Sequence, residues 1–136
     1  MTIIIDFPGI PKAKERPRFS RRSRRPYTPP QTAAYEQSLG WASKLAMKGK
    51  APLQGSLAVS VDAHFPVPQS WSKRDRAAAL IGEIRPKGKP DSDNLLKTAG
   101  DALNGIVWLD DAQIVDADIH KYYSVKPLLH IEVTEL

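Results

Sequence analysis

Hydrophobic and polar residues alternate along several stretches of this chain, which is the pattern of β-strands with one buried face. In the clearest stretch every second residue from Leu57 to Phe65 is hydrophobic, and the residues between them are small or polar. A second alternation lies near the C-terminus, and a β-branched hydrophobic run follows Met1. Prolines and glycines separate these runs from their neighbours. The expected strands are residues 2–7, 57–65, 106–109, 114–124 and 128–135.

Other stretches have hydrophobic residues spaced three or four positions apart, which is the period of a helix with one buried side. Thr32 is expected to cap the first of these helices, and Gly49 is expected to end it. The third helix carries a stripe of leucine and alanine and should end at Asn104-Gly105. The expected helices are residues 33–48, 71–80 and 92–103. The expected hydrophobic faces are Tyr35, Leu39, Ala42, Leu45 and Ala46 in the first helix, and Leu95, Leu96, Ala99, Ala102 and Leu103 in the third.

The resulting order, β-α-β-α-α-β-β-β, predicts an α/β (α+β) fold with a single-layer mixed sheet packed by helices. A chain of 136 residues suits one domain, residues 1–136. The chain has no cysteine, which excludes disulfides and cysteine-bound zinc. No run approaches the roughly 18 apolar residues of a membrane span. We therefore expect a cytoplasmic protein.

The positive charge of the chain is concentrated near the N-terminus. Residues 1–30 carry eight basic and two acidic side chains, so they hold +6 in a chain whose total is +5. Residues 12–30 also contain several prolines, and we expect a basic loop that is mobile without its partner. Dense arginine indicates contact with a nucleic-acid backbone, and a solvated loop without that role is the alternative. The expected DNA-binding residues are Lys12, Lys14, Arg16, Arg18, Arg21, Arg22, Arg24 and Arg25, together with Lys87 and Lys89 of a later basic segment.

An acidic stretch follows that later segment, and Lys97 is its single basic residue. Asp91 and Asp93 fall at the start of the third expected helix, where one aspartate would serve as a cap. Two aspartates at i and i+2, with Asn94 beside them, exceed what capping requires. Asp93, Lys97 and Asp101 repeat every four residues, so a solvent-facing ladder of ion pairs is a second simple explanation. The aspartates of the stretch are Asp91, Asp93, Asp101, Asp110, Asp111, Asp116 and Asp118.

A cation site is the sharper interpretation of this stretch. If the chain after the third helix runs back along it, the turn at Asp110-Asp111 returns towards the helix start. A hard cation such as Mg²⁺ takes carboxylate oxygens, keeps several waters and accepts a phosphate oxygen. Asp91, Asp93 and Asp111 would then bind the metal. Lys97 would stabilise negative charge on the reacting phosphate.

The residues Asp91-x-Asp93-Asn94-Leu95-x-Lys97, then Asp101-Ala102-Leu103, then Trp108-Leu109-Asp110-Asp111-Ala112-Gln113-Ile114-Val115-Asp116, form a combined motif. This motif resembles the RusA-type Holliday junction resolvases (crossover junction endodeoxyribonucleases), which are common in prophages. The resemblance is close over residues 89–121, whereas the first strand, the basic loop and the last strand match in order alone.

The resemblance implies a homodimeric endonuclease that depends on Mg²⁺, with Mn²⁺ as a substitute. Such an enzyme resolves four-way DNA junctions by paired symmetric nicks in DNA recombination and repair. The family's essential acidic residues fall on Asp91, Asp93 and Asp111, and its essential lysine falls on Lys97. Further motif positions, with supporting roles, are Asn94, Asp101 and Asp110.

Three other interpretations bear on the same residues. A metal-dependent nuclease acting on other branched DNA would use the same chemistry. A non-catalytic protein that binds branched DNA would need its aspartates for capping and pairing alone, and loss of binding in Asp93→Asn would favour it. A calcium loop is excluded, because Leu95 and Leu96 occupy positions where a ligand and a glycine belong.

Overall fold

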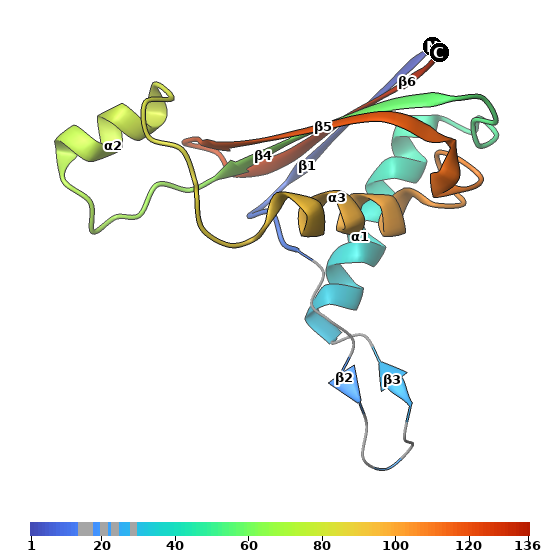
Figure 1. Ribbon diagram of the computed structural model, residues 1–136, viewed down its shortest axis with the longest axis horizontal. Coiled ribbons are helices and arrows are strands. Elements are labelled where there is room, and N and C mark those ends of the chain that lie inside the picture. The colour runs from blue at the N-terminus through green and yellow to red at the C-terminus, as the bar shows by residue number, and fades with distance from the viewer. Residues whose placement is uncertain (14–17, 20–21, 23–24, 28–29) are drawn as a thin grey trace.

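The computed structural model describes residues 1–13, 18–19, 22, 25–27 and 30–136. A four-stranded mixed sheet forms its centre, in the order β1-β6-β4-β5 (Figure 1). β1 and β4 both pair antiparallel with β6, whereas β4 and β5 are parallel. The predicted fold class, a single mixed sheet packed by helices, is confirmed. The strands are β1 (Thr2–Pro8), β4 (Leu57–Phe65), β5 (Ile114–Tyr123) and β6 (Leu128–Glu135).

The helices α1 (Pro30–Met47) and α3 (Ser92–Leu103) cover one face of the sheet (Figure 1). They approach each other closely at Gly40, where a Cβ atom would lie 3.3 Å from Ile106 Cδ1 and 3.4 Å from the Ala102 carbonyl oxygen. The core between helices and sheet is mostly apolar, with Thr32, Ser43 and Thr98 as its buried polar residues, and the burial of its apolar side chains is the main driving force for this layer. Its largest buried side chains are Trp108, Ile5, Leu39, Met47, Leu57, Leu95, Leu103, Leu129 and Ile131.

Polar side chains occupy the opposite face of the sheet, as the alternation predicts. Ser60 donates to Asp118 at 2.5 Å, and His120 Nδ1 lies 3.2 Å from Asp62. His130 forms a hydrogen bond with Asp6 on the neighbouring strand β1. The face is therefore a set of cross-strand polar pairs, rich in carboxylates.

Several predicted boundaries are confirmed and others are wrong. α3, β4 and β6 have the predicted ends. Residues 106–109 form a turn, in which Trp108 makes isolated bridges to Leu53 and Asn104, and not the expected strand. Buried Thr32 lies inside α1, so it is not the expected cap. Leu45 is 78% exposed because the buried face of α1 runs through Leu39, Ser43 and Met47.

Three further segments contain structure that the sequence did not predict in detail. The expected basic loop contains a short antiparallel pair, β2 (Arg18–Phe19) and β3 (Pro26–Tyr27). The helix expected at 71–80 is α2 (Lys73–Leu80), which Ser72 caps by accepting a hydrogen bond from the Asp75 amide at 3.1 Å. A short 3₁₀ helix, η1 (Asp111–Gln113), replaces the expected turn before β5. In the described ranges no helix has the length and apolar character needed to cross a membrane.

Candidate active site

The start of α3 presents two exposed carboxylates. Asp91 is the N-cap residue, and its carbonyl accepts the first helical hydrogen bond from the Leu95 amide at 3.1 Å. The Asp91 side chain makes no capping hydrogen bond, although capping is the usual role of aspartate at this position. Asp93 is exposed in the first turn, near the positive end of the helix dipole. Capping therefore does not account for the Asp91 carboxylate.

The ion-pair ladder along α3 is present only in part. Lys97 Nζ lies 3.9 Å from Asp101 Oδ2, and the lysine side chain is 65% exposed. Within the described ranges, no ion pair joins Lys97 to Asp93. An exposed pair at this distance contributes well under about 1 kcal/mol. Pairing is thus a weak explanation for this set of residues.

Asp110 and Asp111 lie in a corner of the chain that several hydrogen bonds hold in place. Asp110 Oδ1 accepts from the Ala112 amide at 2.9 Å and so caps η1. Gln113 Oε1 accepts from the Asp110 amide at 2.9 Å, while Gln113 Nε2 donates to the carbonyls of Leu53 at 2.8 Å and Gly55 at 3.0 Å. These bonds fix the corner to the segment before β4.

The Asp111 carboxylate is held by a buried indole. Trp108 Nε1 donates to Asp111 Oδ1 at 2.7 Å, and Trp108 is fully buried. The carboxylate also lies against α3, since its atoms are 3.6–3.7 Å from the position that a Cβ on Gly100 would take. Sequence reasoning missed Trp108 as a positioning residue. The Trp108-x-x-Asp111 spacing was the available signal.

Asp111 does not return to the start of α3, which corrects that expectation. Gly100 is seven residues beyond Asp93, or about 10 Å along the helix axis. Lys97 lies between them, three residues before Gly100 and so on the same side of the helix. Within the described part of the chain, no group of three or more acidic or histidine side chains is close enough to share a metal ion.

The acidic end of α3 nevertheless suits Mg²⁺ by its donor chemistry. Mg²⁺ in phosphate-processing sites is usually held by one or two carboxylates, with waters and substrate phosphates completing its shell. Asp91 and Asp93 are exposed, oxygen-bearing and separated by the single residue Ser92. These two residues therefore fit such an ion without a third protein ligand.

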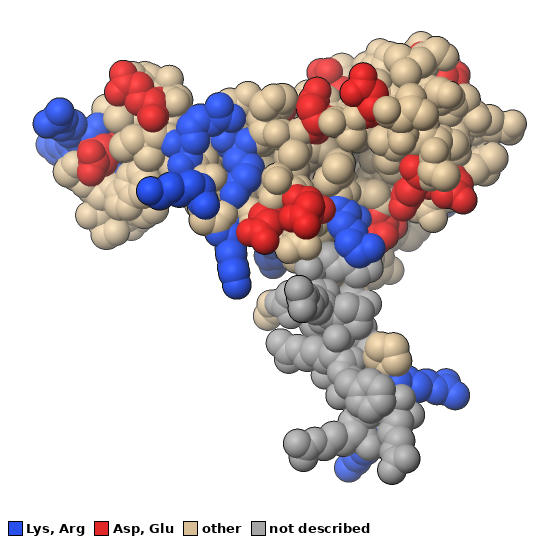
Figure 2. All heavy atoms as spheres, in the orientation of Figure 1, with Lys and Arg blue, Asp and Glu red and all other residues tan. Residues whose placement is uncertain are grey.

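Basic side chains lie beside this acidic end, between α2 and α3 (Figure 2). The segment that joins the two helices carries exposed Arg85, Lys87 and Lys89 directly before Asp91. Arg85 Nε donates to the Lys121 carbonyl at 2.8 Å, and Lys121 Nζ donates to the Gly88 carbonyl at 2.6 Å. The basic segment is thus tied to the end of β5. Arg85 and Lys121 were not among the predicted DNA-binding residues.

The predicted N-terminal DNA-binding residues are described in part. Lys12, Arg22 and Arg25 are exposed. The backbone of Arg18 belongs to β2. Lys14, Arg16, Arg21 and Arg24 lie outside the described residues.

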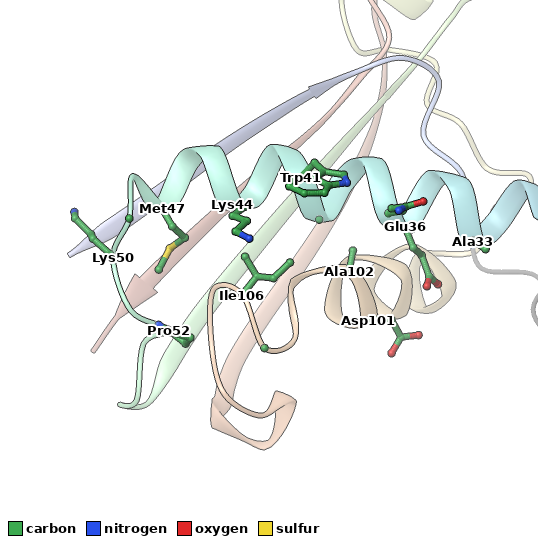
Figure 3. Close-up of a pocket in the computed structure, with 14 residues that line it drawn as sticks. Ala33, Glu36, Trp41, Lys44, Met47, Lys50, Pro52, Asp101, Ala102 and Ile106 are labelled. Carbon is green, nitrogen blue, oxygen red and sulfur yellow. The ribbon is translucent and has the colours of Figure 1, made fainter.

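A groove with a volume of about 770 Å³ separates α1 from the end of α3 (Figure 3). Trp41, which is 60% exposed, borders it together with Ile106 and Ala102. Glu36 and Asp101 lie towards one end of the groove and Lys50 lies towards the other, while Lys44 lies between Lys50 and Trp41 with its Nζ 5.4 Å from the Trp41 ring centroid. The groove therefore has an apolar middle and ends of opposite charge.

Comparison with known proteins gives two matches. The family described as "Endodeoxyribonuclease RusA" matches residues 8–134. The chain is also 31% identical over 132 residues to the "Uncharacterized protein YqaN" of Bacillus subtilis (strain 168). That alignment covers 94% of this chain and 92% of the relative. The family match spans nearly the whole chain, so this protein belongs to the RusA family of endodeoxyribonucleases.

Proposed function

We propose that this protein is a Mg²⁺-dependent endonuclease that resolves four-way DNA junctions by paired symmetric nicks. The observation that carries the proposal is the pair of exposed carboxylates at the start of α3, next to a basic segment. A repulsive acidic cluster has little use at a DNA surface unless a cation binds there. Membership of the RusA family supports the same reaction.

Asp91 and Asp93 would hold the metal ion in this proposal. When bound, the ion polarises the phosphodiester and lowers the pKa of a coordinated water; Mn²⁺ would substitute for Mg²⁺. We include Asp111 as the third ligand. Because Asp111 rests about two helical turns away, its participation requires the site to close when metal and DNA bind. Trp108 would keep the Asp111 carboxylate in one orientation.

Lys97 would stabilise the negative charge that develops on the phosphate. Its ammonium group is exposed, and its partner Asp101 holds it only loosely at 3.9 Å. It lies between Asp93 and the position of Asp111 on the same side of α3. An incoming phosphate can therefore take Lys97 from Asp101 at little cost.

A homodimer is part of the proposal, because an open four-way junction has two-fold symmetry and needs two equivalent sites. We assign the second copy to the groove between α1 and α3. A two-fold axis across its apolar middle would set Lys50 of one copy against Glu36 and Asp101 of the other. Such self-complementarity is what an isologous interface requires. Because α3 borders the groove, both active sites would lie near the axis.

Sedimentation velocity tests the assignment of the groove. Trp41→Glu should convert a dimer into a monomer, because it places a charge in the apolar middle. Val125→Glu is the matched control, since Val125 is 80% exposed in the turn after β5 and does not border the groove. A dimer that survives Trp41→Glu, or a wild-type protein that is monomeric at all concentrations, would remove the assignment.

A cleavage assay tests the activity itself. A labelled four-way junction and a linear duplex built from the same arms are each incubated with Mg²⁺ and with EDTA. We expect symmetric nicks in the junction alone, and only with Mg²⁺. Junction binding without cleavage under Mg²⁺ and Mn²⁺ would refute the catalytic proposal. Cleavage of flaps or forks in preference to the junction would refute the proposed substrate.

A further inference from the structure

A second cavity, with a volume of about 360 Å³, lies between α2 and the ends of β4 and β5. His64 of β4 and Tyr122 and Tyr123 of β5 line it, and these residues are at the carboxyl ends of the two parallel strands. Open α/β sheets often bind ligands at the carboxyl ends of parallel strands. None of the proposed metal-binding residues lines this cavity.

The cavity wall is a set of flat side chains. The Arg85 guanidinium carbon lies 4.3 Å from the centroid of the Tyr122 ring. His64 stacks beside Tyr122 with ring centroids 5.3 Å apart and an interplanar angle of 26°. Trp71 does not line the cavity but supports Tyr123 edge to face, with ring centroids 5.3 Å apart. Aromatic rings and arginine planes are the surfaces on which proteins stack unpaired bases.

The wall is held in place before any ligand arrives. Arg85 Nε donates to the Lys121 carbonyl at 2.8 Å, which leaves its other N–H groups for an anion. Lys121 Nζ donates to the Gly88 carbonyl at 2.6 Å. A wall that is already ordered loses little entropy when it binds a ligand.

Most of the remaining lining is apolar, and Ser124 is its polar member. Ala79 is buried at 1% exposure, and Leu80 and Ile84 complete that side. A ligand would match this arrangement if its flat apolar ring entered the cavity and its charged phosphate stayed outside. A nucleotide has both features, and a cavity of this size is within the range of small-ligand sites.

The cavity also lies close to the candidate active site along the chain. Gly88, which Lys121 holds, is three residues before Asp91 and therefore within about 11 Å of it. Lys87 and Lys89 are exposed on the same short segment. A strand whose phosphate lies at Asp91 and Asp93 would follow these lysines towards the cavity.

We propose that this cavity binds a nucleobase that has left the base stack near the branch point of the DNA. This inference rests on the proposed function, because it takes DNA to be the substrate. Stacking tolerates every base, so the cavity selects for an unpaired base and not for a particular sequence. It would favour branched DNA, where unpaired bases form at lower cost than in a duplex.

Photo-crosslinking with 5-iodouracil tests the proposal on the wild-type protein. The base is placed at positions around the branch point, with EDTA present to prevent cleavage, and the same label is placed in a duplex and in a single strand. We expect crosslinks to Tyr122, Tyr123 or His64 in the junction and the single strand, and fewer in the duplex. Crosslinks that map only to other residues, on a junction that the protein cleaves, would overturn the cavity proposal alone.

Substitution gives a second, quantitative test. Tyr122→Ala should weaken junction binding about 10- to 100-fold, as removal of a stacking ring does, while Tyr122→Phe should bind like wild type. Equal binding by Tyr122→Ala and wild type would overturn the proposal. If the protein does not cleave junctions but the single strand still crosslinks to Tyr122, the cavity proposal stands and the resolvase proposal fails. If none of the three DNAs binds, both proposals fail.

Discussion

A pair of aspartates lies near each end of α3, and the two pairs differ in exposure and in hydrogen bonding. At the start, Asp91 and Asp93 are exposed, and the Asp91 side chain makes no capping hydrogen bond. Beside the other end, Asp110 caps η1 and Asp111 accepts a hydrogen bond from buried Trp108. Asp110 is committed to the fold as a cap, and Asp111 is held in one orientation by its indole donor, whereas the exposed pair is available to a cation without breaking a hydrogen bond. The same residue type therefore has two uses, and its neighbours decide which.

The largest expected effect comes from neutralising the exposed pair. Asp93→Asn should reduce cleavage by more than about 100-fold. That factor is the upper range for losing a residue that only supports a metal ligand, and Asp93 would bind the metal itself. Junction binding should stay the same or tighten, because a negative charge near phosphate is removed. Asp118→Asn is the control, since it removes an equal charge from the opposite face of the sheet, where Ser60 bonds Asp118. If Asp93→Asn abolished binding, the exposed pair would not be catalytic.

Trp108→Phe tests whether Asp111 depends on its indole donor. The change removes the hydrogen bond to Asp111 and leaves an aromatic ring in the core. Cleavage should fall about 10- to 100-fold, and the free energy of unfolding should fall by about 1–3 kcal/mol. Val107→Ala also opens the buried turn but keeps the indole, so it should lose stability with little loss of cleavage. Equal cleavage by the two variants would mean that the hydrogen bond does not position Asp111.

Asp110 should behave as a structural residue. Asp110→Ala removes the η1 cap and should lower the free energy of unfolding by about 1 kcal/mol, whereas Asp110→Asn keeps an acceptor and should be close to wild type. Chemical denaturation measures both changes. Cleavage by the folded variants should match wild type. A loss of cleavage in Asp110→Asn would place Asp110 with the exposed pair.

The smallest expected effect concerns Asp6, a bonded carboxylate on the opposite face of the sheet. Its hydrogen bond to His130 raises the pKa of His130 above the ordinary value, with a smaller contribution from Glu132. The stabilisation is therefore complete below the unfolded pKa of about 6.5 and is lost as pH rises through the folded pKa. Asp6 is mostly exposed, so the loss should stay under about 1 kcal/mol. Denaturation of Asp6→Asn should show a weaker pH dependence than wild type; an equal dependence would exclude the pair as its source.

Local patterns predicted α3, which carries Asp93 and Lys97, and the inner strand β4. The alternation from Leu57 to Phe65 gave β4 with its correct ends, and the leucine stripe gave α3. The short apolar run at 106–109 was wrong as a strand because Trp108 packs into the core from a turn. Period alone cannot distinguish a short buried strand from a buried turn.

The position of Asp111 could not be predicted, because it depends on contacts between distant segments. Gln113 attaches the corner to Leu53 and Gly55, about 60 residues earlier in the chain. That attachment puts Asp111 beside Gly100 and not at the start of α3. The sequence therefore predicts which residue types form the candidate site, but it does not predict the distances between them. That Asp91, Asp93, Lys97 and Asp111 act together in catalysis is still a prediction.

The parallel pairing of β4 and β5 determines which part of this protein can be exchanged without rebuilding the sheet. The chain leaves β4 at Phe65 and must travel the length of the sheet before it enters β5 at Ile114. That single crossover holds α2, the basic segment, α3 and the Asp110-Asp111 corner. Every proposed metal ligand therefore belongs to one contiguous insert between two neighbouring strands. Grafting or lengthening this insert would alter substrate choice while every strand of the sheet kept its present partner.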